Sequence, residues 1–497
     1  MIKRTLLTLF SSLLLMMLVS SCSIQESPIT GSKRAYAYTW EQEVEIGRNA
    51  DQEIVGQYGE YGDEQVNEYV STLSREVLRV SHLRRDDVPE KYRETEFTFR
   101  VLDSPVVNAF ALPGGYVYVT RGLLAHLNND AQLAVVQGHE IGHVAARHAS
   151  QRGLQQTIGQ FAVVGGAILG QELLGLSAER LLNLSSTAAQ LLFLSYSREN
   201  ERESDRLGVE YAAKTGYAAE EGAEFFTSLK RISEQSGSTL PNMLSSHPDP
   251  GEREENIPRL ANQWEEQGYE QTIRNTESYM QMLDGIIYGE NPRNGYVNEG
   301  DFVHPELQFR FNVLNNWQVI NQASRVIQVN ENGTAVVIFS IDSESAGARQ
   351  AAEKYSEQEG FTLQESESAV TTGQLPAHKT LYTVQTQDGQ LGVHVVAVEY
   401  NSMVFEFLSY TSSTSFASLE TVFDGVGLSF SELTDPDILN IQPVRLQVER
   451  AQRSGSFRNF LPSELPMEIT PEEVAILNQV NLDDRIETGT FLKIPTQ

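Results

Sequence analysis

The sequence predicts an α+β protein built from three folded units. The first observation is a helical period of apolar residues, without proline, in residues 40–80 and 131–149. The second is a turn-rich stretch at residues 289–300, which divides the chain. The third is a series of short strand-like runs beyond that stretch. We therefore expect a mainly helical unit with a small sheet, then an antiparallel-sheet unit with helices, then a small strand and helix unit.

The first residues have the pattern of a bacterial lipoprotein signal peptide. Lys3 and Arg4 precede an apolar run over residues 6–19, and small residues lead to Cys22. We predict that residues 1–21 are removed and that Cys22 carries the lipid. The alternative is an ordinary secretory signal followed by an incidental cysteine. The apolar run is too short to favour an uncleaved membrane helix.

Cys22 is the only cysteine in the chain, which excludes an intramolecular disulfide and suits a lipidation site. Ser23 follows it, and the absence of aspartate there resembles lipoproteins sent on to the outer membrane. Residues 22–39 are small and polar, with a proline and a glycine, and we expect a lipid-anchored tether. The predicted location is the periplasmic side of the outer membrane.

The chain is strongly acidic, with a formal net charge of −30. Residues 1–21 contribute two basic residues and no acid, so their removal makes the charge −32. Such a chain is repelled by nucleic acid, which excludes nucleic acid as a partner.

The first unit should contain a small sheet before its central helix. Residues 97–102 have the pattern of a strand, and residues 108–120 form two extended runs around Gly114 and Gly115. The hairpin can present an edge to which an extended polypeptide adds as another strand, or it can be an ordinary core hairpin. From the sequence the two alternatives are equally good.

Residues 139–143 carry the chemistry of the chain. They read His-Glu-Ile-Gly-His, and side chains four apart lie on the same face of a helix, so His139 and His143 can share one cation. Glu140 stands beside the first histidine, where its carboxylate can reach a water molecule. Zinc suits neutral imidazoles with a carboxylate and lowers the pKa of bound water to about 7. The alternative is a pair of ordinary histidines on a helix.

The helix that carries this motif has clear signals at its start. Asn129 or Asp130 can cap it, and residues 131–149 contain no proline. Residues 151–194, which are rich in glycine and leucine, follow it. We weigh a mobile flap against a buried helical hairpin for them and favour the hairpin.

A second polar helix over residues 197–216 can complete the metal site. Glu201 and Asp205 share one face of it, so Glu201 can bind zinc while Asp205 accepts a hydrogen bond from a ligand histidine. Taken alone, the charges of this helix would be a solvated face with weak ion pairs. The two waiting histidines favour the metal-binding interpretation.

Residues 139–143, together with Glu201, Glu203 and Asp205, resemble the gluzincin metallopeptidase family of the CAAX prenyl endopeptidases, HtpX and the periplasmic protease BepA. The resemblance covers about residues 40–293 and implies a zincin-type zinc metallopeptidase domain. It implies zinc held by His139, His143 and Glu201, with Glu140 as the catalytic base. Ser204 stands where the family usually has alanine.

The resemblance extends to the segment around His247 and Arg253. It implies that His247 is a regulatory fourth ligand that holds the enzyme latent, and that Arg253 is a catalytic group stabilising the oxyanion. Without the resemblance we would expect a loop histidine and a surface arginine. His148 should face elsewhere on the helix, as a polar surface or packing residue.

Two further units follow the protease. Residues 300–433 should form an α+β accessory domain with an antiparallel sheet, distantly similar to PsbP-like domains. Residues 441–497 resemble a lysin motif, with a strand, two helices and a strand, although Pro462 and Pro466 interrupt the first helix. Peptidoglycan is then a further partner.

The expected function is a zinc-dependent endopeptidase that hydrolyses misfolded or stalled envelope proteins, anchored to the membrane through Cys22. The alternative is a non-proteolytic periplasmic chaperone or scaffold lipoprotein in which zinc is structural. Glu140 argues against this alternative, because a closed structural site has no need of a general base.

Overall fold

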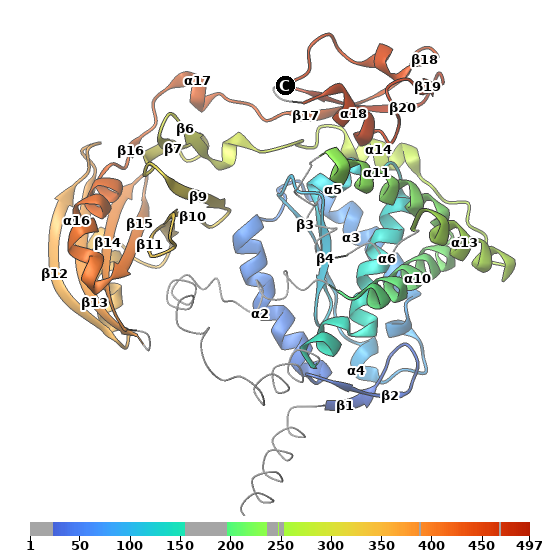
Figure 1. Cartoon of the computed structure of the whole chain (residues 1–497), viewed down its shortest axis with the longest axis horizontal. Coiled ribbons are helices and arrows are strands. Elements are labelled where there is room, and N and C mark those ends of the chain that lie inside the picture. Colours follow the sequence, from blue (N-terminus) through green and yellow to red (C-terminus); the bar gives the residue numbers. More distant parts are fainter. Residues whose placement is uncertain (1–22, 155–195, 236–246, 248–252, 387–388, 467–468) are drawn as a thin grey trace, which may run out of the picture.

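The computed structural model shows the three expected units side by side (Figure 1). It describes the following parts of the chain: residues 23–154, 196–235, 247, 253–386, 389–466 and 469–497. We expected a flap or a hairpin over residues 151–194, and of these residues 155–194 lie outside the described parts, as does Cys22. Among the described residues, no helix is both long and apolar enough to cross a membrane.

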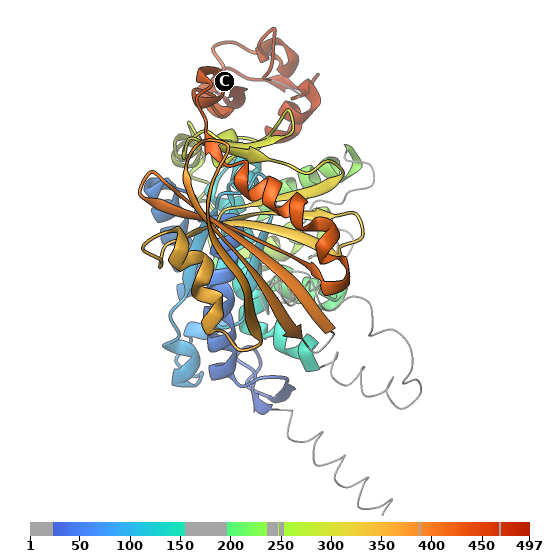
Figure 2. The same ribbon diagram turned by 90° about the vertical axis from the view of Figure 1, so that its left-hand side faces the viewer.

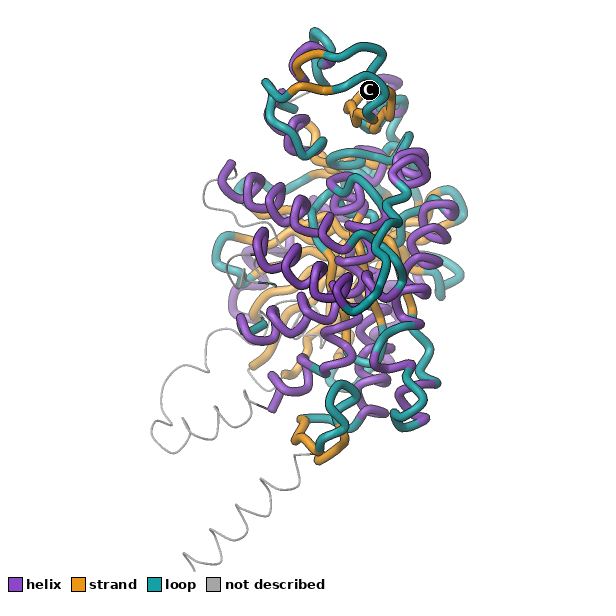
Figure 3. Tube along the Cα trace, turned by 90° about the vertical axis from the view of Figure 1, so that its right-hand side faces the viewer, coloured by secondary structure: helices purple, strands orange, loops and turns teal. Residues whose placement is uncertain are grey.

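The first unit is mainly helical, as predicted, and its helices gather on one side of the molecule (Figure 3). The longer helices are α2 (Trp40–Tyr58), α3 (Glu64–Arg79), α6 (Asp130–Ala146), α10 (Arg198–Lys214), α11 (Gly222–Gln235), α13 (Arg253–Glu266) and α14 (Thr276–Leu283). The shorter ones are η1 (His82–Arg84), α4 (Glu90–Arg93), α5 (Arg121–His126), η2 (Ala219–Glu221) and η3 (Pro292–Asn294).

A three-stranded sheet lies against α6. Its strands are β3 (Thr98–Leu102), β4 (Ala109–Leu112) and β5 (Tyr116–Thr120), in the order β3-β5-β4. Strand β4 pairs with β5 antiparallel, and β3 pairs with β5 parallel. The hairpin between β4 and β5 needs glycine, because Gly114 has a φ of +80° and a Cβ there would stand 2.4 Å from Val44 Cα.

Helix α6 is the centre of this unit, and all of its residues are buried. It begins at the cap Asn129, whose side chain accepts a hydrogen bond from the Gln132 N–H. Helix α10 packs closely along it at Gly138 and Gly208, where a Cβ on Gly208 would stand 2.8 Å from the His139 nitrogen. The close packing that the metal site requires is therefore present.

The segment before α2 corrects a prediction, because we expected a tether over residues 22–39. From residue 23 on, this segment folds as an antiparallel hairpin of β1 (Ser23–Glu26) and β2 (Lys33–Tyr36). The Tyr36 ring is buried under the Arg147 guanidinium, 3.7 Å from the ring centroid. The contact between this ring and the guanidinium helps to dock the short polar hairpin.

The accessory domain contains the predicted antiparallel sheet, which Figure 2 shows face-on. Its strands, in spatial order, are β12 (Phe361–Val370), β13 (Pro376–Thr386), β14 (Gly389–Tyr400), β15 (Met403–Ser412), β11 (Ala335–Asp342), β10 (Arg325–Asn330) and β9 (Trp317–Gln322). A smaller sheet joins β16 (Ser431–Glu432), β8 (Phe309–Asn312), β7 (Asp301–His304) and β6 (Tyr296–Asn298).

Both faces of the larger sheet are covered. Val396 and Phe423 of α16 (Ser413–Leu428) belong to one hydrophobic cluster, and Val395 and Ala351 of α15 (Ala348–Glu353) belong to another. A four-residue 3-10 helix, η4 (Lys354–Glu357), follows α15. Alternate residues of β14 therefore face opposite layers.

The C-terminal unit pairs strand β17 (Arg445–Arg450) with β20 (Phe491–Thr496). The other elements of this part are α17 (Pro436–Leu439), β18 (Gly455–Ser456), η5 (Phe457–Phe460), α18 (Pro471–Leu477) and β19 (Arg485–Ile486). The first of the two expected helices is replaced by η5, a four-residue 3-10 helix that ends before Pro462. That part of the prediction was wrong.

Candidate metal centre

Helix α6 holds His139 and His143 one turn apart on its buried face. Their Nε2 atoms lie only 2.9 Å from each other. Glu201 of α10 faces both rings, with carboxylate oxygens 3.5 Å from each Nε2. The structure thus brings together the three ligands that the sequence predicts.

His247 joins the same cluster from a separate segment of the chain. Its Nδ1 lies 3.3 Å from a Glu201 oxygen and 3.4 Å from His139 Nε2. One donor atom from each of these four residues lies within 4.8 Å of the others, and all four residues are buried. Three imidazole nitrogens and one carboxylate form a donor set that suits zinc.

The electrostatics of the cluster also suit a cation. Burial lowers the pKa of His143 well below its ordinary value, so this ring is neutral and offers a lone pair. Burial works to raise the pKa of Glu201, but the nearby His247 and His139 outweigh it and hold that pKa well below its usual range. Burial also works to lower the pKa of His139, while Asp205 and Glu201 raise it to about 10. A cation must therefore displace a proton from His139.

Glu140 is a buried carboxylate beside the cluster. Among the described residues neither of its oxygens has a hydrogen-bond partner, and burial raises its pKa. Its Oε1 lies 3.7 Å from His247 Nε2. A buried carboxylate without hydrogen-bond partners costs free energy, and this cost fits a group that needs a water molecule or a substrate.

Asp205 and Arg253 lie behind the ligands. Asp205 Oδ1 is 2.9 Å from His139 Nδ1, on the side of the ring away from the cluster. Arg253 Nε contacts Asp205 Oδ2 at 2.9 Å, and its Nη2 contacts Glu201 Oε2 at 2.7 Å. These contacts make Arg253 a positioning group for two carboxylates, and its role as an oxyanion stabiliser stays a prediction.

Two residues at the site were not expected from the sequence. His148 was expected to face elsewhere, but it is buried with Nδ1 3.0 Å from His143 Nδ1, so that expectation was wrong. The reason is Arg147, which ends α6 in the left-handed conformation with a φ of +59° and redirects the next residue. Tyr196 packs against the His143 ring at a centroid distance of 4.0 Å, with the two rings tilted by 30°. Nothing in the helical period indicated either contact.

Strand β4 borders the cluster. Ala111 and Leu112 line a small cavity together with His143 and Tyr196. In the part of the chain that the structure describes, β4 pairs only with β5 and is an edge strand. This arrangement favours the first of our two hairpin alternatives.

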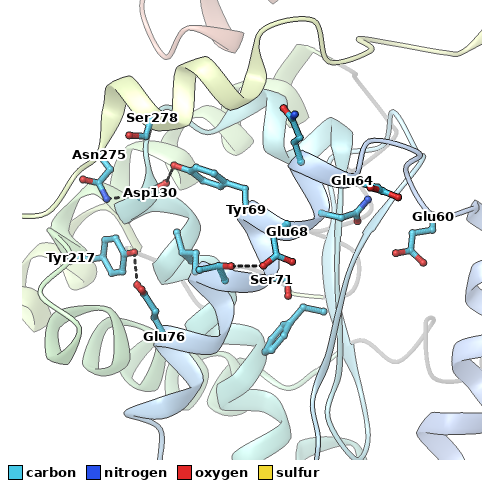
Figure 4. A pocket seen from close by; sticks show the side chains of 15 residues that line it. Glu60, Glu64, Glu68, Tyr69, Ser71, Glu76, Asp130, Tyr217, Asn275 and Ser278 are labelled. Carbon is cyan, nitrogen blue, oxygen red and sulfur yellow. Dashed lines mark hydrogen bonds between the residues drawn. The ribbon is translucent and has the colours of Figure 1, made fainter.

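A large open groove lies elsewhere on the described surface (Figure 4). It has a volume of about 1060 Å³ and lies beside α3 and the start of α6, with Glu64, Glu68, Glu76 and Asp130 in its lining. None of the four clustered donors lines it. The donor set, and not the size of a groove, therefore identifies the candidate site.

Comparisons with known proteins agree with this geometry. The family described as Peptidase family M48 matches residues 67–261. The beta-barrel assembly-enhancing protease of Yersinia pestis is 31% identical over 208 residues, which are 40% of this chain and 40% of that protein. The mitochondrial metalloendopeptidase OMA1 of Arabidopsis thaliana is 35% identical over 166 residues, which are 33% of this chain and 32% of that protein.

These matches span less than half the length of the relatives. A solved structure of the cyanobacterial PsbP (CyanoP) from Synechocystis aligns with 28% of this chain and 96% of its own, at 15% identity and a TM-score of 0.23. The likeness to PsbP-like domains therefore stays a prediction. The M48 match contains His139, Glu140, His143 and Glu201. Residues 67–261 therefore match the model of this peptidase family.

Proposed function

We propose that this protein is a zinc-dependent endopeptidase. The observation that carries the proposal is the convergence of His139, His143, Glu201 and His247 beside the unpartnered Glu140 carboxylate. The family of the domain and a relative named as a metalloendopeptidase support it. Zinc is the proposed cofactor, one ion for each chain.

The protein's own residues divide the work of hydrolysis. Zinc, when bound by His139, His143 and Glu201, supplies Lewis acidity toward the scissile carbonyl. Glu140 takes a proton from the attacking water molecule and later delivers it to the leaving amine nitrogen. Asp205 orients His139 through Nδ1. An extended substrate segment pairs with the edge of β4. Main-chain hydrogen bonds then position the scissile peptide bond, with little specificity for the substrate side chains.

His247 is the proposed restraint on this site. It occupies the place that an open catalytic site leaves for water or substrate, so the arrangement with His247 in the cluster is the latent one. Cleavage then requires this ring to move away from the cluster.

We place the substrates in the bacterial envelope. The relative from Yersinia pestis is named for β-barrel assembly, and the pattern around Cys22 is that of a lipoprotein. Misfolded or stalled envelope proteins are the proposed substrates, in a role of quality control at the outer membrane. The C-terminal unit is the proposed contact with peptidoglycan.

A second function deserves a test because His247 completes a four-donor site, as in structural zinc centres. In this alternative the protein is a non-proteolytic envelope chaperone or scaffold. Glu140 distinguishes the two functions, because a structural zinc site does not need the Glu140 carboxylate as a general base.

The test compares the wild type with Glu140→Gln on an unfolded envelope protein, with zinc content measured in both. We expect equal zinc content and a loss of cleavage of at least about 100-fold in the variant, since general-base catalysis contributes that much. Glu199→Gln, an exposed glutamate of α10, is the matched control and should cleave normally. Equal cleavage by Glu140→Gln would refute the mechanism. If the wild type and the His247→Ala variant both bind zinc and neither cleaves the substrate, the result would support the scaffold.

A further inference from the structure

A series of side-chain contacts leads away from the metal cluster, from His143 through His148 to Glu203. His143 Nε2 faces the cluster, and its Nδ1 lies 3.0 Å from His148 Nδ1. The other nitrogen of His148, Nε2, lies 3.1 Å from a Glu203 oxygen. His148 is fully buried, and the Glu203 side chain is 23% exposed.

The donor and acceptor roles along this chain follow from its outer end. An ionised carboxylate only accepts hydrogen bonds, so His148 Nε2 must carry a proton. A neutral imidazole has one N–H, so His148 Nδ1 accepts. Two groups lie near this atom, Ser204 Oγ at 3.4 Å and His143 Nδ1 at 3.0 Å, and His143 makes the shorter contact and donates. The proton of His143 is then on Nδ1, and the lone pair of Nε2 points to the cluster.

We propose that His148 and Glu203 form a relay that fixes the tautomer and the ring orientation of His143 for zinc binding. His148 and Glu203 are positioning residues, because neither contributes a donor atom to the cluster. The inference rests on the proposed function of the same site. Each of the two histidines is thus supported by a carboxylate of α10. Asp205 contacts His139 directly, whereas Glu203 supports His143 through His148.

The local backbone is built for this contact. On an uninterrupted helix, residues 143 and 148 would point about 140° apart, at 100° per residue. Arg147 breaks the helix in the left-handed conformation, and its guanidinium is held by Glu43 through Nε at 2.9 Å and Nη2 at 2.6 Å. The left-handed conformation is unfavourable for a non-glycine residue, and the contacts of the buried guanidinium help to hold it.

The test measures zinc affinity by competition with a chelator, together with the visible spectrum of the Co²⁺-substituted protein. His148→Leu removes both hydrogen bonds, whereas His148→Gln keeps them, because its amide N–H donates to Glu203 and its carbonyl oxygen accepts from His143. Glu203→Ala removes the outer end of the relay. Glu199→Ala, exposed on the same helix, is the matched control.

We expect His148→Leu and Glu203→Ala each to weaken zinc binding by about 10- to 100-fold and to change the Co²⁺ spectrum. His148→Gln and Glu199→Ala should stay near the wild type. The double variant of His148→Leu and Glu203→Ala should bind no more weakly than His148→Leu, because Glu203 acts through His148.

A wild-type zinc affinity in His148→Leu would overturn the relay. Equal weakening of zinc binding by His148→Leu and His148→Gln would also overturn it, as would additive losses of affinity in the double variant. If His148→Leu fails to fold, Glu203→Ala decides, since that side chain is partly exposed. A wild-type protein that binds no zinc would refute the proposed function itself, which is a different result from equal binding by all variants.

Discussion

Buried charge at the metal centre is compensated residue by residue. Glu201 and Asp205 share one guanidinium, that of Arg253, which is 3% exposed. Because ligand carboxylates are fixed by such contacts, we attribute the geometry of Glu201 to Arg253 as much as to α10. The sequence indicated that Arg253 belongs to the site, but it did not indicate which groups the guanidinium contacts.

His247 gives a direct prediction at this scale. His247→Ala should raise the rate of proteolysis by about tenfold if the ring occupies the cluster nine-tenths of the time, because the competent fraction then rises from one-tenth to nearly all. The rate is measured on an unfolded envelope protein, with zinc content as the control. Unchanged or lower activity in a variant that keeps its zinc would contradict the latent arrangement.

At the scale of elements, the sequence predicted those parts that carry a strong period or motif. Helices α6 and α10 and the hairpin of β4 and β5 were expected within a few residues of their observed bounds. Strand β12 was missed, because it lies at the edge of its sheet with most of its side chains exposed and shows no apolar alternation. The redirection of His148 was missed because one left-handed residue has no periodic signal.

Helix α5 gives a prediction on pH. Burial lowers the pKa of His126 from 6.5 to about 4, and its Nδ1 lies 2.7 Å from the Gly122 carbonyl oxygen. Between pH 6.5 and about 4, the unfolded chain therefore binds a proton at this side chain that the folded chain does not bind. The free energy of unfolding should therefore decrease as the pH is lowered through this window, by about 3 kcal/mol in total.

His126→Gln should remove this contribution, because glutamine does not titrate and can still donate to the Gly122 carbonyl. The measurement is the urea midpoint of unfolding at several pH values between 7 and 4. We expect a flatter dependence in the variant than in the wild type. Two parallel curves would show that His126 does not contribute.

At the scale of the whole molecule, the three units are in direct contact. Lys493 of the C-terminal unit is buried, and its Nζ donates to the carbonyl oxygens of Ala125 and Leu127 at 2.7 and 2.9 Å. Ala323 and Ser324 of the accessory domain donate backbone hydrogen bonds to the last carbonyls of α2. The Lys493 contact lies just before α6, so the C-terminal unit supports the start of the helix that carries His139 and His143.

These contacts show where sequence reasoning ends. The order of the units and the ligands His139, His143 and Glu201 follow from local patterns, because spacing on a helix determines which side chains share a face. The docking of Tyr36 and Lys493 joins residues far apart in the chain, and their residue types alone would place them at the surface. The approach of His139, His143 and Glu201 to one another was predictable, whereas the contacts around these side chains required the fold.

The central claim is that one zinc ion is held between His139, His143 and Glu201. X-ray diffraction from crystals of the zinc-loaded protein, collected on both sides of the zinc absorption edge, tests it most directly. We predict one anomalous peak for each chain, at about 2.0–2.2 Å from both Nε2 atoms and from a Glu201 oxygen. An empty cluster in protein that contains zinc, or a peak bound by other residues, would contradict the account.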